Sequence, residues 1–181
     1  MTDFLEKIKA QQDPLKKLLG HIPGFSGYAE RQTRRDADKL LRDTVARRFE
    51  EYWKRTTNFQ NDLVGSGKIA FVDDVERAAV QLRTFIDKIK MAPRGYAGLF
   101  DAIKIQEQEL EALYQFDLAF FELGDQIGRA LDTLEATLQD DAGLPAAIHN
   151  LLELGRLAVT TYDKRTEAVT GQNAEPPPAS S

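Results

Sequence analysis

The residue types that carry most enzyme and metal chemistry are scarce in this sequence. Its 181 residues include two histidines and no cysteine, which excludes disulfides, thiol catalysis and cysteine-based zinc sites. Di-metal sites in helical bundles need a glutamate three residues before a histidine on two helices. Leu18 and Ala146 occupy those positions before His21 and His149. We therefore expect no metal site, no cofactor, no small-molecule substrate and no enzyme activity.

A short glycine-rich string at 65–68, GSGK, has part of the composition of a phosphate-binding loop. Such a loop needs a glycine five residues before its Gly-Lys pair and a serine or threonine after the lysine. Asp62 and Ile69 occupy these two positions. The string therefore predicts a turn and no nucleotide site.

Basic residues are concentrated in one stretch that could face nucleic acid. The arginines of this stretch are Arg31, Arg34, Arg35, Arg42, Arg47, Arg48 and Arg55. Acids stand four residues before cations in the pairs Glu30–Arg34, Asp38–Arg42, Asp43–Arg47, Glu50–Lys54 and Glu51–Arg55. This order of charges stabilises a helix and gives the cations local partners. Together with a net charge of −5, it predicts a solvated helix face and no nucleic-acid partner.

Two loops share a composition that could form a binding surface. The segments 22–28 (IPGFSGY) and 93–100 (PRGYAGLF) each combine proline, two glycines and two aromatic residues before a long helical stretch. In an antiparallel bundle both loops would lie at the same end. Their candidate partner-binding residues are Phe25, Tyr28, Arg94, Tyr96 and Phe100. These side chains either close the end of the core or form a docking site, because aromatic and arginine side chains dominate interface energetics.

The elements that must position these loops are helices. Between the glycine and proline clusters, apolar residues recur every three or four positions over stretches far longer than ordinary strands. The pattern predicts helices over 2–20 (kinked at Pro14), 28–63, 73–91, 99–139 and 145–169. We expect an all-α fold, an elongated up-down antiparallel helical bundle with two long helices and coiled-coil-like seams. The domain organisation is an amphipathic N-terminal helix over 1–22, the bundle over 23–170 and a disordered proline-rich tail over 171–181.

The fourth predicted helix carries an unbroken apolar repeat that is typical of a coiled coil. We call it the predicted seam; its candidate self-association residues are Leu110, Leu113, Asp117, Ile127, Leu131 and Leu134. The two long helices exceed the length of the others, so they either project as a hairpin or pair with another copy. We expect a homo-oligomer joined along this seam.

Asp117 is an unusual residue on the predicted seam. A buried carboxylate would need a charged partner, and Arg47, Arg48 or Arg83 is the expected one. A small rotation of the helix would instead put Asp117 at the boundary of the core. Farther along the chain, Gly124, Gly128 and Gly155 indicate places where helices approach closely.

Charge is divided unevenly along the chain. Residues 1–57 carry a net charge of +4 and the remainder −9. The segment 101–141 holds 11 acids against Lys104 and Arg129. The basic second helix and the acidic fourth helix could pair within the chain or between chains; the simpler interpretation is that the charges set register and solubility.

The N-terminal helix has two interpretations. Its apolar residues Phe4, Leu5, Ile8, Leu15, Leu18 and Leu19 could dock on the bundle or contact a membrane surface. Docking is favoured, because a net charge of only +1 attracts anionic lipid weakly. No run approaches the roughly 20 apolar residues of a membrane span, and no secretory signal is evident. These patterns predict a cytoplasmic, non-enzymatic scaffold or adaptor that binds a protein and self-associates; the alternative is a peripheral membrane protein of helical-hairpin type.

Overall fold

The computed structural model describes Gly20, His21 and the ranges 31–91 and 107–170, with side chains described at 20–21, from 39 to 91 and from 114 to 168. Its helices are α3 (Arg31–Gly65), α4 (Val72–Met91), α6 (Glu107–Ala136) and α7 (Leu144–Thr170), with a short 3₁₀ helix, η2 (Ile69–Phe71). The described ranges contain helices and no strand, so the all-α prediction is confirmed. The tail at 171–181 and most of the helix predicted over 2–20 lie outside the described residues.

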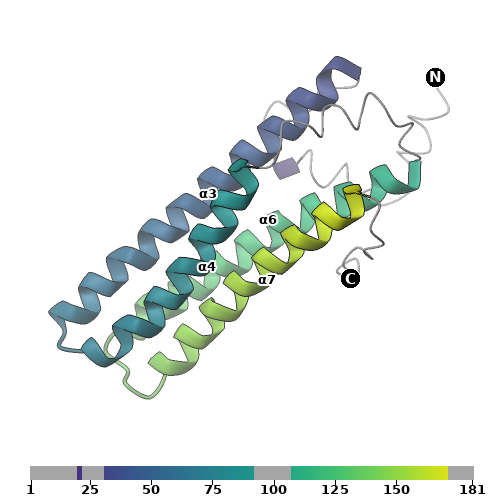
Figure 1. The fold of residues 1–181 in the computed structure, drawn as a ribbon. Coiled ribbons are helices and arrows are strands. Elements are labelled where there is room, and N and C mark those ends of the chain that lie inside the picture. Colours follow the sequence, from purple (N-terminus) through teal and green to yellow (C-terminus); the bar gives the residue numbers. More distant parts are fainter. Residues whose placement is uncertain (1–19, 22–30, 92–106, 171–181) are drawn as a thin grey trace.

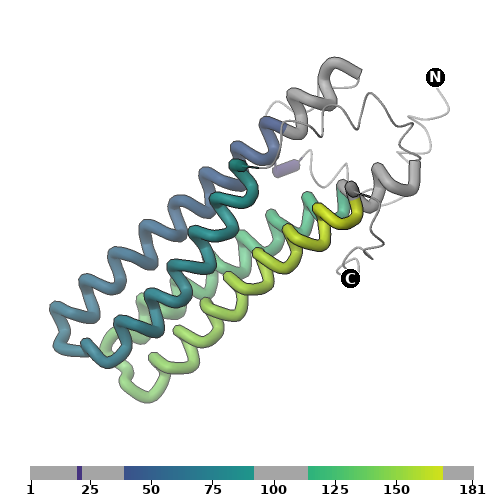
Figure 2. Tube along the Cα trace, in the orientation of Figure 1, coloured from purple at the N-terminus to yellow at the C-terminus, as the bar shows by residue number. Residues whose placement is uncertain are grey.

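The four helices form a bundle of two hairpins (Figure 1). In the hairpins, α3 packs on α4 and α6 packs on α7. The hairpins lie side by side, so that α4 also contacts α7 and α3 contacts α6. We call the end that holds both hairpin turns the turn end. The opposite end, where α3 and α6 begin and α4 and α7 finish, is the open end (Figure 2).

Helix directions follow the prediction within each hairpin and differ between hairpins. The partners in α3–α4 and in α6–α7 run antiparallel, as expected from their short connections. Across the hairpins the neighbours are parallel, since ion pairs join Arg48 to Asp125 and Arg55 to Asp132 at the same offset along the chain. Helices α4 and α6, which follow one another in the sequence, are therefore diagonal in the bundle.

An aromatic cluster joins all four helices in the core. Each helix contributes one ring: Phe49 from α3, Phe85 from α4, Phe120 from α6 and Tyr162 from α7. The Phe85 ring centroid lies 4.3 Å from that of Phe49, 5.3 Å from that of Phe120 and 6.4 Å from that of Tyr162. The spacing that predicted helix 73–91 marks the core face correctly, because the side chains at its apolar positions are buried: Val75, Ala78, Leu82, Phe85 and Ile89.

Helix lengths differ as the sequence indicated. Helix α3 has 35 residues and α4 has 20, which correspond to roughly 52 and 30 Å at a rise of about 1.5 Å per residue. Since the two helices meet at the turn end, α3 begins beyond the last turn of α4 (Figure 1). The open end of the bundle is therefore uneven.

The predicted turn at 65–68 is confirmed, and a glycine defines its geometry. Gly67 has a φ of 75°, and its N–H donates to the carbonyl of Val64 at 3.1 Å. The N–H of Lys68 donates to the carbonyl of Leu63 at 2.8 Å. These two bonds form the Schellman motif, which ends a helix with a left-handed residue. The Lys68 side chain then pairs with Asp141 in the turn between α6 and α7, so the two turns are joined.

Replacing Gly67 with alanine should lower the free energy of unfolding by about 1–2 kcal/mol, because a Cβ is unfavourable in the left-handed conformation. Gly65 is the matched control: it is the last residue of α3, its φ is not positive, and an added Cβ would meet no atom within 4 Å. Gly65→Ala should be neutral or stabilise by up to about 1 kcal/mol. Urea unfolding of both variants measures the difference, and equal effects would contradict this account of the turn.

Candidate functional site

The candidate partner-binding residues lie outside the described residues. These are Phe25, Tyr28, Arg94, Tyr96 and Phe100. The structure does describe where their segments join the bundle. The segment 22–30 leads into α3 at Arg31, and the segment 92–106 connects Met91 of α4 to Glu107 of α6. All three attachment points are at the open end, as the antiparallel arrangement predicted (Figure 1).

The six residues proposed for membrane contact also lie outside the described residues: Phe4, Leu5, Ile8, Leu15, Leu18 and Leu19. Among the helices that the structure describes, none combines the length and the apolar character needed to cross a bilayer. Nor does the described part hold any group of three or more potential metal ligands.

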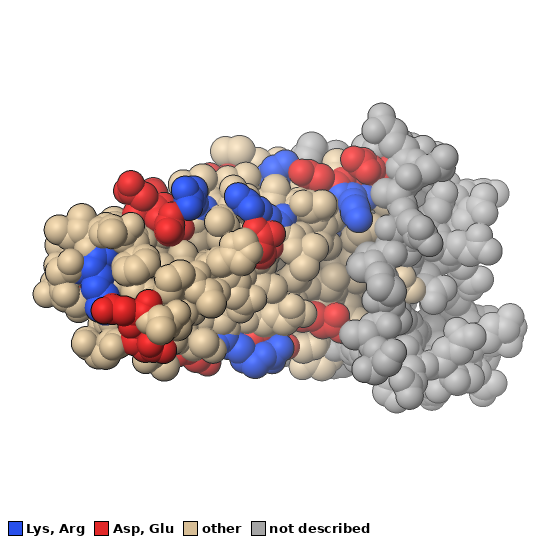
Figure 3. All heavy atoms as spheres, turned by 90° about the horizontal axis from the view of Figure 1, so that it is seen from below, with Lys and Arg blue, Asp and Glu red and all other residues tan. Residues whose placement is uncertain are grey.

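One side of the bundle presents mixed charge. On the face in Figure 3, basic and acidic groups are interspersed. The exposed large apolar side chains of the described part are spread over α3, η2, α4 and α7, with two of them on α4: Val64, Ile69, Val80, Met91 and Leu157. Scattered apolar residues of this kind are normal on a soluble surface. The most exposed of them is Met91, at 80%, and it ends α4 at the open end.

The predicted seam of α6 is filled within one chain. Ile127, Leu131 and Leu134 are fully buried in the core of the bundle, and the side chains of Leu110 and Leu113 lie outside the described part. The expectation that Ile127, Leu131 and Leu134 join two copies needs correction, because helices of the same chain already cover these three side chains. Self-association itself stays a prediction.

Asp117 is buried, and its partner is Arg165 of α7. The guanidinium Nε donates to Oδ1 of the carboxylate at 2.6 Å, and Nη2 lies 3.5 Å from Oδ2. The side chains are 8% and 5% exposed. The expectation of Arg47, Arg48 or Arg83 was wrong. A helical repeat can mark Asp117 as internal, but it carries no information about a partner 48 residues away.

Removing one charge of this pair should be strongly destabilising. Asp117→Asn leaves the Arg165 guanidinium buried without its carboxylate, and we expect a loss of about 3–5 kcal/mol in the free energy of unfolding. The double variant Asp117→Leu/Arg165→Met should recover most of that loss, because apolar residues can replace a buried ion pair. Asp132→Asn, at a carboxylate 70% exposed, is the control, and chemical denaturation is the measurement. A cost for Asp117→Asn no larger than the control would contradict this role.

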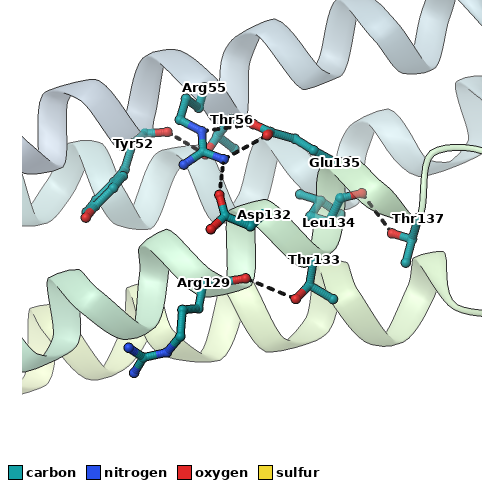
Figure 4. Close-up of polar contacts among 9 residues, drawn as sticks. All are labelled: Tyr52, Arg55, Thr56, Arg129, Asp132, Thr133, Leu134, Glu135 and Thr137. Atoms are coloured by element: carbon teal, nitrogen blue, oxygen red, sulfur yellow. Dashed lines mark hydrogen bonds and ion pairs between the residues drawn. The ribbon is translucent and has the colours of Figure 1, made fainter.

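The α3–α6 interface is the smallest of the four, and ion pairs bridge it. Arg55 of α3 makes a fork with Glu135, with Nε–Oε1 at 2.9 Å and Nη2–Oε2 at 2.7 Å (Figure 4). Its Nη2 also donates to Oδ1 of Asp132 at 2.7 Å. The hydrogen bond to Glu135 is the main cause that raises the pKa of Arg55 above its ordinary value. Seven residues before Arg55, and so about two helical turns nearer the open end, Arg48 pairs with Asp125.

These pairs revise the charge pattern expected from the sequence. The structure pairs Arg55 with α6 where the local pattern pointed to Glu51, and Lys90 of α4 binds Glu50 where the pattern pointed to Lys54. The basic second helix and the acidic fourth helix thus pair within the chain, one of the two possibilities that the charge distribution left open. Arg48 and Arg55 are engaged by carboxylates of α6.

The three glycines occupy close approaches, as predicted. On α6, an added Cβ at Gly124 would lie 3.4 Å from the Arg48 guanidinium, and one at Gly128 would lie 3.1 Å from the Tyr52 hydroxyl. At Gly155 of α7 it would lie 2.9 Å from Cβ of Gln81 on α4. The first two glycines make room for polar groups of α3, whereas Gly155 brings two backbones together.

The ion pairs across α3–α6 should contribute modestly and depend on salt. A double-mutant cycle with Arg55→Gln and Glu135→Gln should give a coupling of at most about 1 kcal/mol, since both groups are partly exposed. The coupling should fall in 1 M salt, where the screening length is about 3 Å. The control cycle uses Arg156 and Glu153, which pair within α7, and should give only a few tenths of a kcal/mol. An Arg55–Glu135 coupling that salt leaves unchanged would argue against this description.

Comparison with models of known protein families, with curated proteins and with solved structures found no match to this chain. Function therefore has to be argued from the residues and their arrangement.

Proposed function

We propose that this chain is a non-enzymatic helical scaffold or adaptor that binds a protein partner at the open end of its bundle. The observation that carries the proposal is the convergence of attachment points. Both aromatic segments, 22–30 and 92–106, join the bundle at the open end, beside the highly exposed Met91. A surface that combines several aromatic side chains with Arg94 has the composition of a protein-binding site.

The rest of the described surface also supports a binding site at the open end, because its charged and apolar groups form few other candidate binding surfaces. Arg48 and Arg55 are engaged in intramolecular ion pairs, and the apolar face of α6 is inside the core. Exposed apolar side chains elsewhere are single residues on separate elements. We extend the proposal to self-association, and we place the contact between copies at the open end in place of the buried seam.

Self-association through the open end predicts a specific pattern in sedimentation equilibrium. The average mass of the wild-type chain should rise with protein concentration, because two open ends bury aromatic surface against each other. Tyr96→Ala/Phe100→Ala should keep the helical content and reduce that rise. The matched control is Val80→Ala/Leu157→Ala, which truncates two exposed side chains on the sides of the bundle and should behave as wild type. A wild-type chain that stays monomeric throughout would remove self-association from the proposal.

The alternative, a peripheral membrane protein anchored by residues 2–20, predicts a different result. Co-sedimentation with anionic vesicles should compare the full chain with a chain lacking residues 1–22. If the full chain pellets and the shortened chain does not, the N-terminal segment is an anchor and the alternative replaces the scaffold. If neither pellets, the scaffold proposal stands.

A further inference from the structure

We propose that the chain docks its own N-terminal segment on α6, at the open-end part of the α3–α6 interface, with His21 as the anchoring side chain. The inference is independent of the proposed function, because it concerns a contact within one chain. It starts from the way in which α3 and α6 meet.

The face of α6 that turns toward α3 is identified by its neighbours. Gly124 and Gly128 lie on this face, because an added Cβ at each would meet a side chain of α3. Phe121 precedes these glycines by three and seven positions, which places it on the same face of the helix. Two of the ion pairs that join α3 and α6, Arg48–Asp125 and Arg55–Asp132, share an offset of 77 residues. The same offset puts Phe121 level with Thr44, nearer the open end than either pair.

Phe121 is only 2% exposed, and part of its cover comes from the N-terminal region of the chain. The ring of His21 stacks on the Phe121 ring with a centroid distance of 4.9 Å and an angle of 12° between the planes. In Figure 1, the short piece at Gly20 and His21 is drawn between the ribbons of α3 and α6. Stacked rings at this separation attract one another beyond the gain from burial.

The chemistry of the preceding segment fits this position. Leu18 and Leu19 directly precede Gly20 and His21 in the sequence, and we propose that they contact the same face of α6. The segment 1–21 holds four lysines and three acids, a net charge of +1, whereas 101–141 holds 11 acids and two bases. The apolar side chains of the segment therefore carry the proposed docking beside the Phe121 ring, and its small positive charge is compatible with an acidic helix.

Docking in this way would make the N-terminal segment part of the bundle. Its apolar residues would then be covered by the chain itself, and a membrane or a second copy would have to displace them. The face of α6 that carries Phe121 would act as a receptor for that segment. The occupant is residues 1–21 of the same chain.

The two histidines make a direct test possible by nuclear magnetic resonance. Ring protons of His21 should be shifted upfield by the Phe121 ring, whereas those of His149, which is exposed on α7, should resonate near the values of free imidazole. Phe121→Leu should remove the His21 shift and leave His149 unchanged. Phe116→Leu is the matched control, because Phe116 is a buried phenylalanine of α6 that does not stack on His21. Unshifted His21 protons, or a shift that survives Phe121→Leu, would overturn the proposal.

Two further measurements separate docking of the segment from a contact of His21 alone. Trypsin should cut after Lys16 and Lys17 several-fold faster in His21→Ala than in the wild-type chain, while the matched variant His149→Ala should be cut at the wild-type rate. Equal rates in all three proteins would overturn docking. The His21 shift should also be independent of protein concentration. A shift that disappears on dilution would mean that a second copy supplies the segment, and it would overturn the assignment to the same chain.

Discussion

The meeting of four aromatic rings is the constraint on which the rest of the bundle depends. Phe85 of α4 contacts rings from the other three helices, so the two hairpins can close only at the level where these rings interlock. Each favourable ring pair adds about 0.5–1.5 kcal/mol to the gain from burial. Because the cluster lies between the turn end and the open end, it aligns the hairpins lengthwise, and the polar contacts between them must form wherever that alignment puts them.

The contacts between the hairpins differ in chemistry. Helices α4 and α7 approach so closely that Gly155 has no room for a side chain against Gln81. Helices α3 and α6 are joined by Arg48 and Arg55, which reach carboxylates across the interface. One edge of the bundle is therefore closed by backbone proximity and the other by partly exposed charge. Salt weakens the second kind of contact and has little effect on the first.

Much of the fold could be predicted because its information is local. The spacing of Val75, Ala78, Leu82 and Phe85 marked a buried helix face before any partner was known, and the turn at Gly67 followed from residue type. Pairing between elements could not be predicted in the same way. Nothing near Asp117 in the sequence points to Arg165, and nothing near His21 points to Phe121. The aromatic loops stay a prediction, since they lie outside the described residues.

The glycine at position 155 has a mechanical consequence for the whole molecule. With α4 and α7 in near contact, these two helices form the tightly packed edge between the hairpins. The α3–α6 edge is the less extensive contact on the opposite side of the bundle. Any separation of the two hairpins would then be a rotation about the α4–α7 contact. It would first break the ion pairs of Arg48 and Arg55 across the α3–α6 edge. Contacts within each hairpin would not be broken by this rotation, including the buried Asp117–Arg165 pair between α6 and α7. The same rotation would also separate Phe85 from Phe120 and Tyr162, so the ring cluster is the contact that opposes it.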